Sequence, residues 1–387
     1  MFFSVLHMAI INIKGVKIVS ELYPVRLIPV FKDYLWGGTK LKTVFNKKSE
    51  LNILAESWEL SANKDGQSII ANGKYQGYGL KEYIDIVGKE IVGTKGLALD
   101  DFPILIKFID AKKNLSVQVH PDDEYATCHD GANAKTEMWY ILDCNVGAYL
   151  YYGFKKDITK QEYQDAIRSN TITDVLNKVP VHKGDVFFIP AGTVHAIGAG
   201  ILICEIQQNS NTTYRVYDYD RRDKDGNKRE LHIREALESS NLKKSTYSNS
   251  VLDGDDIILT QCDYFTVRRL KVQNRVQLRI DKTSFHSLII TDGSGELYMG
   301  GEILKLNKGD SIFIPAQNNE YTVSGPCEII LSFLSSISKS RNVVNFLEGL
   351  DHVRTFTISA YFTLFKILTF HAKRIQDRPV LLISLNP

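Results

Sequence analysis

The stretch KGDVFFIPAGTVHAIG, residues 183–198, returns later in the chain as KGDSIFIPAQNNEYTVSG, residues 308–325. A second pair of similar stretches lies upstream of these, YILDCNVGAYLY at 140–151 and LIITDGSGELYM at 288–299. The copies are 125 residues apart in the first pair and 148 in the second. The difference of 23 residues is close to the length of a helical pattern at 159–179, so we interpret the chain as a duplicated unit with a helical insertion in its first copy.

The residues around both copies are typical of β-structure. Short runs rich in β-branched and aromatic residues, such as FPILIKFID, DVFFIP and YFTVRRLKV, alternate with turns rich in Gly, Asn and Asp. Besides 159–179, the stretch LKEYIDIVGKEIVG has a helical pattern. Many short strands with few helices predict a mainly β protein built as a sandwich, a barrel or a jelly roll.

The composition is that of an ordinary globular protein, with 44% hydrophobic and 24% charged residues among 387. A formal net charge of +2 without a basic block argues against nucleic acid as a partner. No apolar run reaches the ~18 residues of a membrane helix, so no membrane partner is expected. The five cysteines are scattered and form no CxxC pair, which favours reduced thiols and a cytoplasmic protein.

The stretch LSVQVHPDD contains half of a candidate metal site. Gln118 and His120 are two residues apart in a strand-like run, so they share a face, with Val117 and Val119 on the other. Such a pair is either a polar spot on a solvated sheet or part of a metal site. A single histidine is more often a hydrogen-bonded structural residue than a ligand, so further residues must decide.

Two residues of the first copy complete this candidate site. Glu137 in AKTEMWYI begins one predicted strand, and His195 in PAGTVHAIG follows a turn after another. Two imidazoles, one carboxylate and the amide oxygen of Gln118 suit a divalent metal such as zinc. Two histidines and a carboxylate are also the triad of non-haem iron oxygenases, but a fourth protein ligand would fill a position that oxygen chemistry leaves open. In the second copy Glu320 falls opposite His195, so no metal is expected there.

Two cations accompany these ligands. Lys135 lies two residues before Glu137 and would share its face on a strand, and Arg215 follows the polar run QQNSNTTY. A Lys and an Arg beside a metal could hold a phosphate or neutralise a developing oxyanion. Alternatively, Arg215 pairs with Asp218 or Asp220 on the surface. The cluster DYDRRDKDGNKRE alternates in charge sign and is interpreted as a solvated loop.

Two motifs near the N-terminus are not decisive alone. WGGTKL contains a turn, and Glu56, Ser57 and Glu59 of AESWELS either line a pocket or are half-buried polar strand residues. Together with LSVQVHPDD, KTEMWYIL and PAGTVHAIGAGILICEIQQNSNTTYRVYDYD, however, they resemble the type I mannose-6-phosphate isomerases (phosphomannose isomerases) in their short bacterial form. The resemblance covers roughly residues 22–334, and the combination of motifs is highly specific.

The resemblance implies a fold and a metal site. The family belongs to the cupin superfamily and has two jelly-roll-like β domains. The expected fold class is therefore a mainly β, cupin-type double jelly roll with a small helical insertion. The family binds one zinc ion per chain, through ligands that fall here on Gln118, His120, Glu137 and His195.

The resemblance also implies an activity, the interconversion of mannose 6-phosphate and fructose 6-phosphate in carbohydrate metabolism. The expected partner is thus a small hexose phosphate, and the catalytic and substrate-binding motif residues fall on Lys135 and Arg215. A proton would move between C2 and C1 through a cis-enediol, carried by Lys135 or a zinc-bound water, while Glu205 receives no role. Relatives often have Asp where this chain has Asn211, which can bind a sugar hydroxyl but cannot take a proton. Two alternatives stay open, a metal-bearing cupin that binds sugar phosphate without catalysis and a cupin iron oxygenase.

The expected organisation has four parts. They are an N-terminal extension at 1–21, a metal-bearing catalytic cupin domain at 22–250, a second cupin domain without a metal site at 251–336, and an atypical tail at 337–387. The tail has seven Lys/Arg and three Asp/Glu, a net of +4 against −2 for the remainder. We interpret it as a translated frameshift or a loosely packed appendage.

Overall fold

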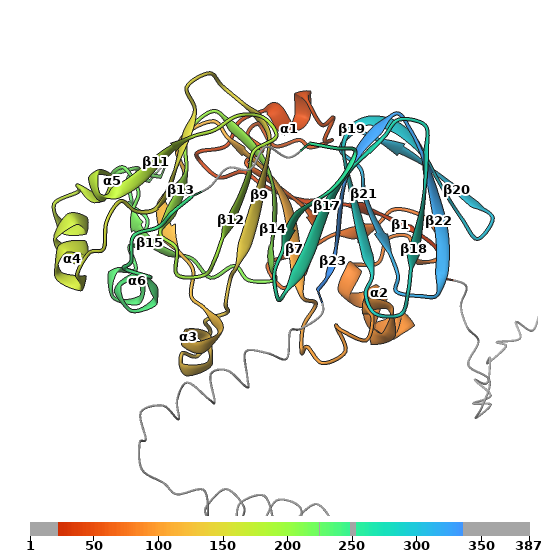
Figure 1. The fold of residues 1–387 in the computed structure, drawn as a ribbon, viewed down its shortest axis with the longest axis horizontal. Helices are drawn as coiled ribbons and strands as arrows, with labels where there is room; N and C mark the ends of the chain where they lie inside the picture. The colour runs from red at the N-terminus through yellow and green to blue at the C-terminus, as the bar shows by residue number, and fades with distance from the viewer. Residues whose placement is uncertain (1–21, 224, 248–252, 336–387) are drawn as a thin grey trace, which may run out of the picture. The chain divides into compact units, whose positions relative to one another are not determined.

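The strands of the protein form two sandwiches in the computed structural model (Figure 1). The structure describes residues 22–223, 225–247 and 253–335, so the expected extension at 1–21 and tail at 337–387 lie outside the described residues. In the described ranges, no helix is both long and apolar enough to cross a membrane. The antiparallel sheets confirm the predicted mainly β fold.

The first sandwich has a six-stranded and a five-stranded antiparallel sheet. In spatial order, the six-stranded sheet consists of β12 (Val186–Ile189), β9 (Glu137–Cys144), β14 (Ile201–Gln208), β7 (Ile104–Ala111), β3 (Glu56–Leu60) and β2 (Val30–Lys32). The five-stranded sheet consists of β11 (Leu176–Pro180), β10 (Tyr149–Phe154), β13 (His195–Ile197), β8 (Val117–Val119) and β15 (Tyr214–Tyr217). Apolar side chains between the two sheets form one core, which includes Trp139, Leu150 and Phe187.

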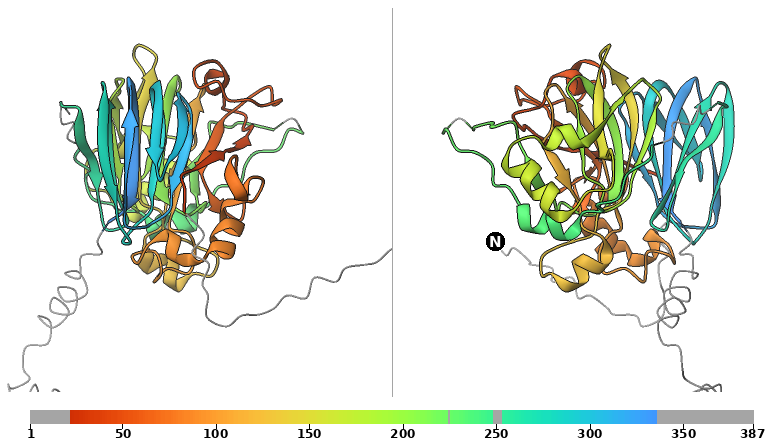
Figure 2. Two further views of the ribbon diagram at one scale, coloured as in Figure 1. Left: turned by 90° about the vertical axis from the view of Figure 1, so that its right-hand side faces the viewer. Right: turned by 60° about the vertical axis from the view of Figure 1, so that its left-hand side comes forward.

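The strands between residues 256 and 334, teal to blue in Figure 2, form the second sandwich around one long strand, β19 (His286–Met299). Its first half pairs with β21 (Ser311–Ile314) and β23 (Cys327–Leu334), and its second half with β20 (Glu302–Asn307) and β22 (Asn319–Ser324). The same ten-stranded sheet contains β16 (Asp256–Gln261), β17 (Phe265–Val272), β18 (Arg275–Ile280), β1 (Val25–Ile28) and β6 (Ile69–Ile70). Strands from the N-terminal part of the chain therefore join the sheet of the second copy, and the boundary near residue 250 remains a proposal.

The two copies differ where the helical insertion was predicted. In the second copy, β19 and β20 form a tight hairpin that turns at Gly300 and Gly301. In the first copy, the connection between the matching strands β10 and β11 contains α4 (Lys160–Arg168) and α5 (Ile172–Val175). The predicted insertion is confirmed, although its helices end earlier than expected because residues 176–179 pair with β10 as part of β11.

Helices cover the outer face of the five-stranded sheet (Figure 1). Val117 and Val119 of β8 are buried in a cluster with residues of α4 and α6 (Ile233–Ser239), opposite the face that carries Gln118. The predicted division of this stretch into two faces is therefore confirmed. The remaining described elements are α1 (Lys40–Thr43), α2 (Leu80–Val87), α3 (Asp123–Cys128), the 3-10 turns Gly73–Tyr75 and Lys89–Val92, and the hairpin of β4 (Ala62–Asn63) and β5 (Gly66–Gln67).

A second core joins the two sandwiches and buries the other face of the six-stranded sheet. Along β14, Ile201 and Ile203 face the core of the first sandwich, whereas Leu202, Cys204 and Ile206 belong to this shared cluster. Residues of β17, β19, β21, β23 and α2 supply its other side. Because both faces of β14 are buried, its first four residues, ILIC, are a continuous apolar run rather than an alternating one.

Replacing Phe313 of β21 by Ala should strongly destabilise the protein. The ring is fully buried in the shared cluster, and its centroid lies 5.2 to 6.5 Å from those of Tyr83, Phe102 and Phe285. We expect the free energy of unfolding to fall by about 3–5 kcal/mol in a denaturant titration. The control is Ile303→Ala on β20, a residue that is 60% exposed, for which a change within about 0.5 kcal/mol is expected. Equal small changes in both variants would contradict a shared core.

Candidate active site

The candidate site lies where one face of the six-stranded sheet changes from apolar to polar. On β9, Glu137 precedes the core residue Trp139 on the same face, and on β14, Glu205 follows Ile203. Lys107 on β7 is paired in register with Glu205, which is paired on its other side with Trp139. These side chains therefore continue the row of core residues, but they place charges in it.

Three potential ligands converge at this end of the sandwich. His120 follows β8, and Glu137 and His195 begin β9 and β13. One ligand atom from each lies within 4.8 Å of the others, and the residues are at most 1% exposed. Gln118 is paired in register with His195, and its amide lies 3.5 Å from the Nε2 atom of that histidine. Across the described residues, this is the single group of His, Cys, Asp or Glu with metal-site spacing.

Both histidines are held in the form that can bind a metal. The Nδ1–H of His120 donates to the carbonyl oxygen of Thr212 at 2.8 Å, and that of His195 to the carbonyl oxygen of Thr193 at 2.9 Å. These bonds leave a lone pair on each Nε2 atom. Burial lowers the pKa of His195 to about 4, and burial with the nearby Lys135 ammonium lowers that of His120 well below its usual value. Both rings are therefore neutral near pH 7.

The contacts of Glu137 show that a cation fits among these atoms. Its Oε1 atom lies 3.2 Å from the Nε2 of His195, which carries no hydrogen in this tautomer, and no described residue donates to Oε1. Burial raises the pKa of Glu137 to about 7, and in the ionised form two lone pairs face each other in a buried space, an arrangement that a cation between them would stabilise. A half-turn of the Gln118 amide directs its oxygen to the same place. The donor set of two imidazoles, one carboxylate and one amide oxygen fits a divalent metal.

Lys135 connects this cluster to a cavity. Its Nζ atom lies 2.6 Å from Oε2 of Glu137 and 3.2 Å from Nε2 of His120, and the residue is 5% exposed. Lys135 and Gln118 also line a cavity of about 250 Å³. The other charged or amide-bearing residues in its wall are Glu56, Lys107, Glu205, Asn211, Arg215 and Arg229. The structure therefore places Lys135, Asn211 and Arg215, all predicted from the sequence, in the wall of one cavity, and Lys135 joins that wall to the cluster.

The ion-pair network of Lys107 and Glu205 was missed by the sequence analysis. The Nζ atom of Lys107 lies 3.3 Å from Glu205 and 3.7 Å from Glu56, and the Nε1–H of Trp139 donates to Glu205 at 3.1 Å. Burial alone would raise the pKa of Glu205, but the ammonium groups of Lys135 and Lys107 outweigh it and hold this pKa below its usual value. A single charge inside an apolar strand run, as in FPILIKFID and ILICEIQ, was the signal that could have found both.

The two N-terminal motifs have separate tasks. In AESWELS, Glu56 lines the cavity, whereas Glu59 forms a buried ion pair with Lys47 at 2.6 Å. In WGGTKL, Trp36 lines the cavity, and the chain passes so close to β3 that a Cβ on Gly37 would lie 2.5 Å from the backbone of Ala55. Glycine at this position therefore allows the loop that carries the tryptophan to pack against the sheet.

Arg215 does not form the surface ion pair that was the alternative to a site role. Its Nε–H donates to Ser116 at 3.3 Å and its Nη1–H to the carbonyl oxygen of Glu230 at 3.0 Å. Asp218 pairs instead with Arg221 and Arg229, and Asp220 pairs with Lys228. The cluster DYDRRDKDGNKRE was interpreted as a solvated loop, which is wrong for two of its residues. Asp218 is 6% exposed, and Arg229 lines the cavity. Both follow because the loop folds back against β15.

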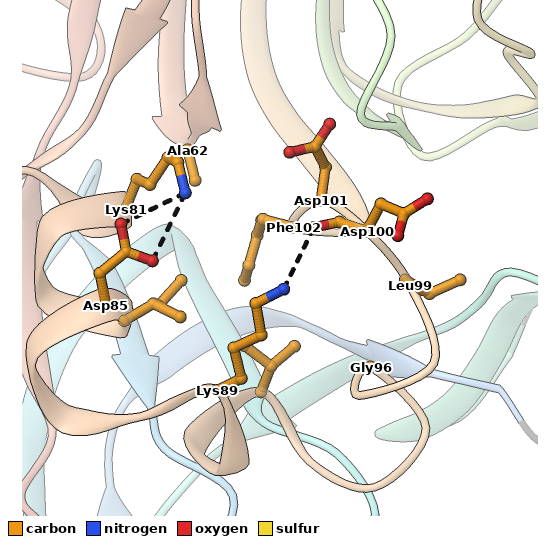
Figure 3. Close-up of a pocket in the computed structure, with 11 residues that line it drawn as sticks. Ala62, Lys81, Asp85, Lys89, Gly96, Leu99, Asp100, Asp101 and Phe102 are labelled. Carbon is orange, nitrogen blue, oxygen red and sulfur yellow. Dashed lines mark hydrogen bonds and ion pairs between the residues drawn. The ribbon is translucent and has the colours of Figure 1, made fainter.

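A separate depression lies between α2 and the segment 96–102 (Figure 3). Its volume of about 30 Å³ leaves room for one or two water molecules. Lys81 and Asp85 form an ion pair along α2 at 3.3 Å, and Lys89 donates to the carbonyl oxygen of Asp100 at 3.4 Å (Figure 3). The depression is too small for a sugar and contains none of the predicted site residues.

Comparisons with known proteins agree with this fold. Residues 25–143 match the family "Phosphomannose isomerase type I, catalytic domain", and residues 255–334 match "Mannose-6-phosphate isomerase, cupin domain". The chain is 38% identical over 317 residues to mannose-6-phosphate isomerase ManA of Bacillus subtilis, covering 80% of this chain and 99% of that protein. It is 36% identical over 303 residues to the mannose-6-phosphate isomerase of Streptococcus mutans serotype c, covering 77% and 94%.

Solved structures show the same likeness. The crystal structure of the mannose 6-phosphate isomerase from Bacillus subtilis matches with a TM-score of 0.73 and 36% identity, covering 80% of this chain and 99% of that one. A putative mannosephosphate isomerase from Archaeoglobus fulgidus, at 22% identity and a TM-score of 0.68 over 81% of this chain and 99% of that one, shares the fold. The protein is thus an isomerase of the cupin class. The chain belongs to the type I mannose-6-phosphate isomerase family, as its motifs indicated.

Replacing His195 by Ala should remove most of the bound metal. The substitution deletes one of three converging ligand atoms, so the remaining residues offer fewer ligands than a metal site requires. Elemental analysis after dialysis against zinc should find near one zinc per wild-type chain and far less in the variant. The control is His286→Ala. His286 is a half-buried histidine of the second sandwich that shares a hydrogen bond with the Tyr321 hydroxyl, and among the described residues it belongs to no group with metal-site spacing. Equal zinc content in His195→Ala and the wild type would contradict the site.

Proposed function

We propose that this protein is a zinc-dependent aldose–ketose isomerase that interconverts mannose 6-phosphate and fructose 6-phosphate through a cis-enediol. The observation that carries the proposal is the buried convergence of His120, Glu137 and His195 at a cavity lined by Lys135 and Arg215, in a chain of this family. Zinc suits the donor set, and the reaction requires no redox step, which fits a metal without redox chemistry. The scattered free cysteines are consistent with a cytoplasmic location, which we also propose.

A bound zinc ion would supply Lewis acidity for the charge that develops on O1 and O2 of the open-chain sugar. Its proposed ligands are Gln118, His120, Glu137 and His195, at one site per chain. The hydrogen bonds from the Nδ1–H groups to Thr212 and Thr193 hold the two rings in place before any ligand arrives. The chain therefore has no need to reorganise the site during the reaction, which is a large part of electrostatic catalysis.

Lys135 is the proposed proton carrier. Its Nζ atom lies beside the ligand cluster and also in the cavity wall, so it is adjacent to the place where C1 and C2 of the sugar would bind. Lys135 would first have to release the proton of its ammonium form; the neutral amine would then take the proton from C2 of the aldose and return it at C1, so that the transfer itself consumes no net proton. The Glu137 carboxylate, 2.6 Å away, orients the amine and stabilises the ammonium that forms.

Arg215 and Asn211 would position the substrate. The guanidinium of Arg215 is fixed by Ser116 and by the carbonyl oxygen of Glu230, so it presents a stationary positive charge to the sugar phosphate or its reacting oxygens. Asn211 is exposed at the cavity, where its amide donates to Asp65 at 3.1 Å and remains able to accept a bond from a sugar hydroxyl. An amide cannot take a proton, so this position has no acid or base role.

Removal and return of zinc tests the proposal as a whole. Turnover of mannose 6-phosphate should disappear after treatment with a chelator and return when zinc is added. Metal-bound protein that binds hexose phosphate without turnover would instead support the sugar-binding alternative. Activity that depends on iron and oxygen would support the oxygenase alternative.

Single substitutions test the two cations. Lys135→Ala and Arg215→Ala should each lower kcat/KM by about 10²-fold or more, because each removes a charge from the reacting centre. Bound zinc should stay near one per chain in both, as neither residue is a proposed ligand. Full activity in either variant would exclude the role assigned to that residue.

A further inference from the structure

We propose that Arg229 binds the phosphate group of the sugar phosphate, a role that rests on the isomerase function proposed above. The residue lies in the loop after β15, which the sequence pattern had predicted to be solvated. The position of Arg229 indicates where each end of the substrate would bind. The reacting carbons would lie at the cluster of His120, Glu137 and His195, and the phosphate would lie where the loop closes the cavity.

Arg229 stands at the junction of two cavities. The cavity beside the cluster, of about 250 Å³, and a neighbouring cavity of about 220 Å³ both have Tyr34, Trp36 and Arg229 in their walls. Arg229 is the one cationic residue that the two linings share. A substrate that extends from the cluster towards the neighbouring cavity therefore meets this guanidinium at the junction.

The guanidinium of Arg229 is held on one edge and open on another. Its Nε–H donates to Oδ2 of Asp218 at 2.8 Å, and its Nη2–H donates to Oδ1 at 2.5 Å. The Nη1 atom has no hydrogen bond to any described residue, and the side chain is 36% exposed. Asp218 is 6% exposed and so provides a fixed support. An arginine fixed in this way keeps N–H donors directed at a ligand, an arrangement suited to phosphate.

The charges around Asp218 leave a surplus that an anion would neutralise. Arg221 and Arg229 both pair with this one carboxylate, and Arg215 has no ion pair with a described residue. Burial, followed by repulsion from Arg229, lowers the pKa of Arg215, in agreement with an excess of positive charge there. Asp33 and Asp223 line the neighbouring cavity and are absent from the wall beside the cluster.

Backbone contacts fix Arg229 relative to the rest of the site. The residue that follows it, Glu230, accepts a hydrogen bond from the side chain of Arg215. The backbone N–H of His232 donates to the carbonyl oxygen of Arg215 at 2.8 Å. The returning limb of the loop is therefore tied to β15, which is paired with the strand that carries Gln118. A phosphate bound here would hold the sugar at a defined place relative to the ligand cluster, which converts binding energy into orientation.

The variants Arg229→Ala and Arg229→Lys test this proposal, with Arg234→Ala as the matched control. Arg234 is an arginine of α6 whose side chain is 80% exposed and pairs with Glu235. For Arg229→Ala we expect the KM for mannose 6-phosphate to rise about 10- to 100-fold, the worth of a hydrogen bond to a charged group, with little change in kcat. Arg229→Lys should recover part of this loss, because it restores the charge without the fork. Arg234→Ala should behave as the wild type.

Inorganic phosphate provides a readout that a structural role would not change. As a competitive inhibitor it should bind Arg229→Ala more weakly by a similar factor, and Arg234→Ala as tightly as the wild type. Unchanged KM and phosphate inhibition in Arg229→Ala would overturn the proposal, as would a loss of kcat at constant KM.

A direct binding measurement separates this proposal from the proposed function. If the wild type does not isomerise mannose 6-phosphate, the isomerase function fails, and calorimetric titration with mannose 6-phosphate still tests Arg229. Binding to the wild type that weakens in Arg229→Ala would support the phosphate site. Equal binding to both proteins, or none to the wild type, would overturn it.

Discussion

The burial of one β-sheet on both faces is the constraint on which the rest of this protein depends. The six-stranded sheet lies between the core of the first sandwich and the core shared with the second, so its alternate side chains have no access to water on either side. Polar atoms in such a sheet must find partners within the protein. Glu137, Lys107 and Glu205 are charged residues of these strands, and each lies within ion-pair distance of an oppositely charged side chain.

Compensation of these charges also creates the chemistry of the site. Lys135 balances Glu137, and Lys107 lies between Glu56 and Glu205, while the two histidines avoid a charge by remaining neutral. One pairing is incomplete, since Oε1 of Glu137 has no donor among the described residues and faces an imidazole lone pair. The low dielectric of these surroundings makes the arrangement unfavourable when no cation is bound. It also strengthens the electrostatic attraction of a cation that binds there.

The two copies of the duplicated unit have different residues at matching positions. The strands β12 and β21 come from the two copies of the KGD stretch, and each pairs with the strand of the matching upstream stretch, β9 or β19. In the first copy, β13 begins with His195, whereas the matching position in β22 is the exposed Glu320. His286 is the histidine nearest to the position of Glu137 in the second copy, and its partner is the hydroxyl of Tyr321. The second sandwich contributes apolar residues to the cluster that covers the other face of the six-stranded sheet.

The amino-acid sequence by itself indicated the class of fold, the repeat with its helical insertion, and Gln118, His120, Glu137 and His195 as candidate ligands at the ends of strands. Strand patterns and strand ends are local properties of the chain, whereas the approach of His120, Glu137 and His195 to one another is decided by the tertiary structure. Only the tertiary structure decided which charged residues of the apolar strands line the same cavity. It also placed Arg229, from a loop of alternating charge, in the wall of that cavity. Such contacts join residues far apart in the chain, and their free energy depends on burial and on neighbouring charges that no local pattern specifies.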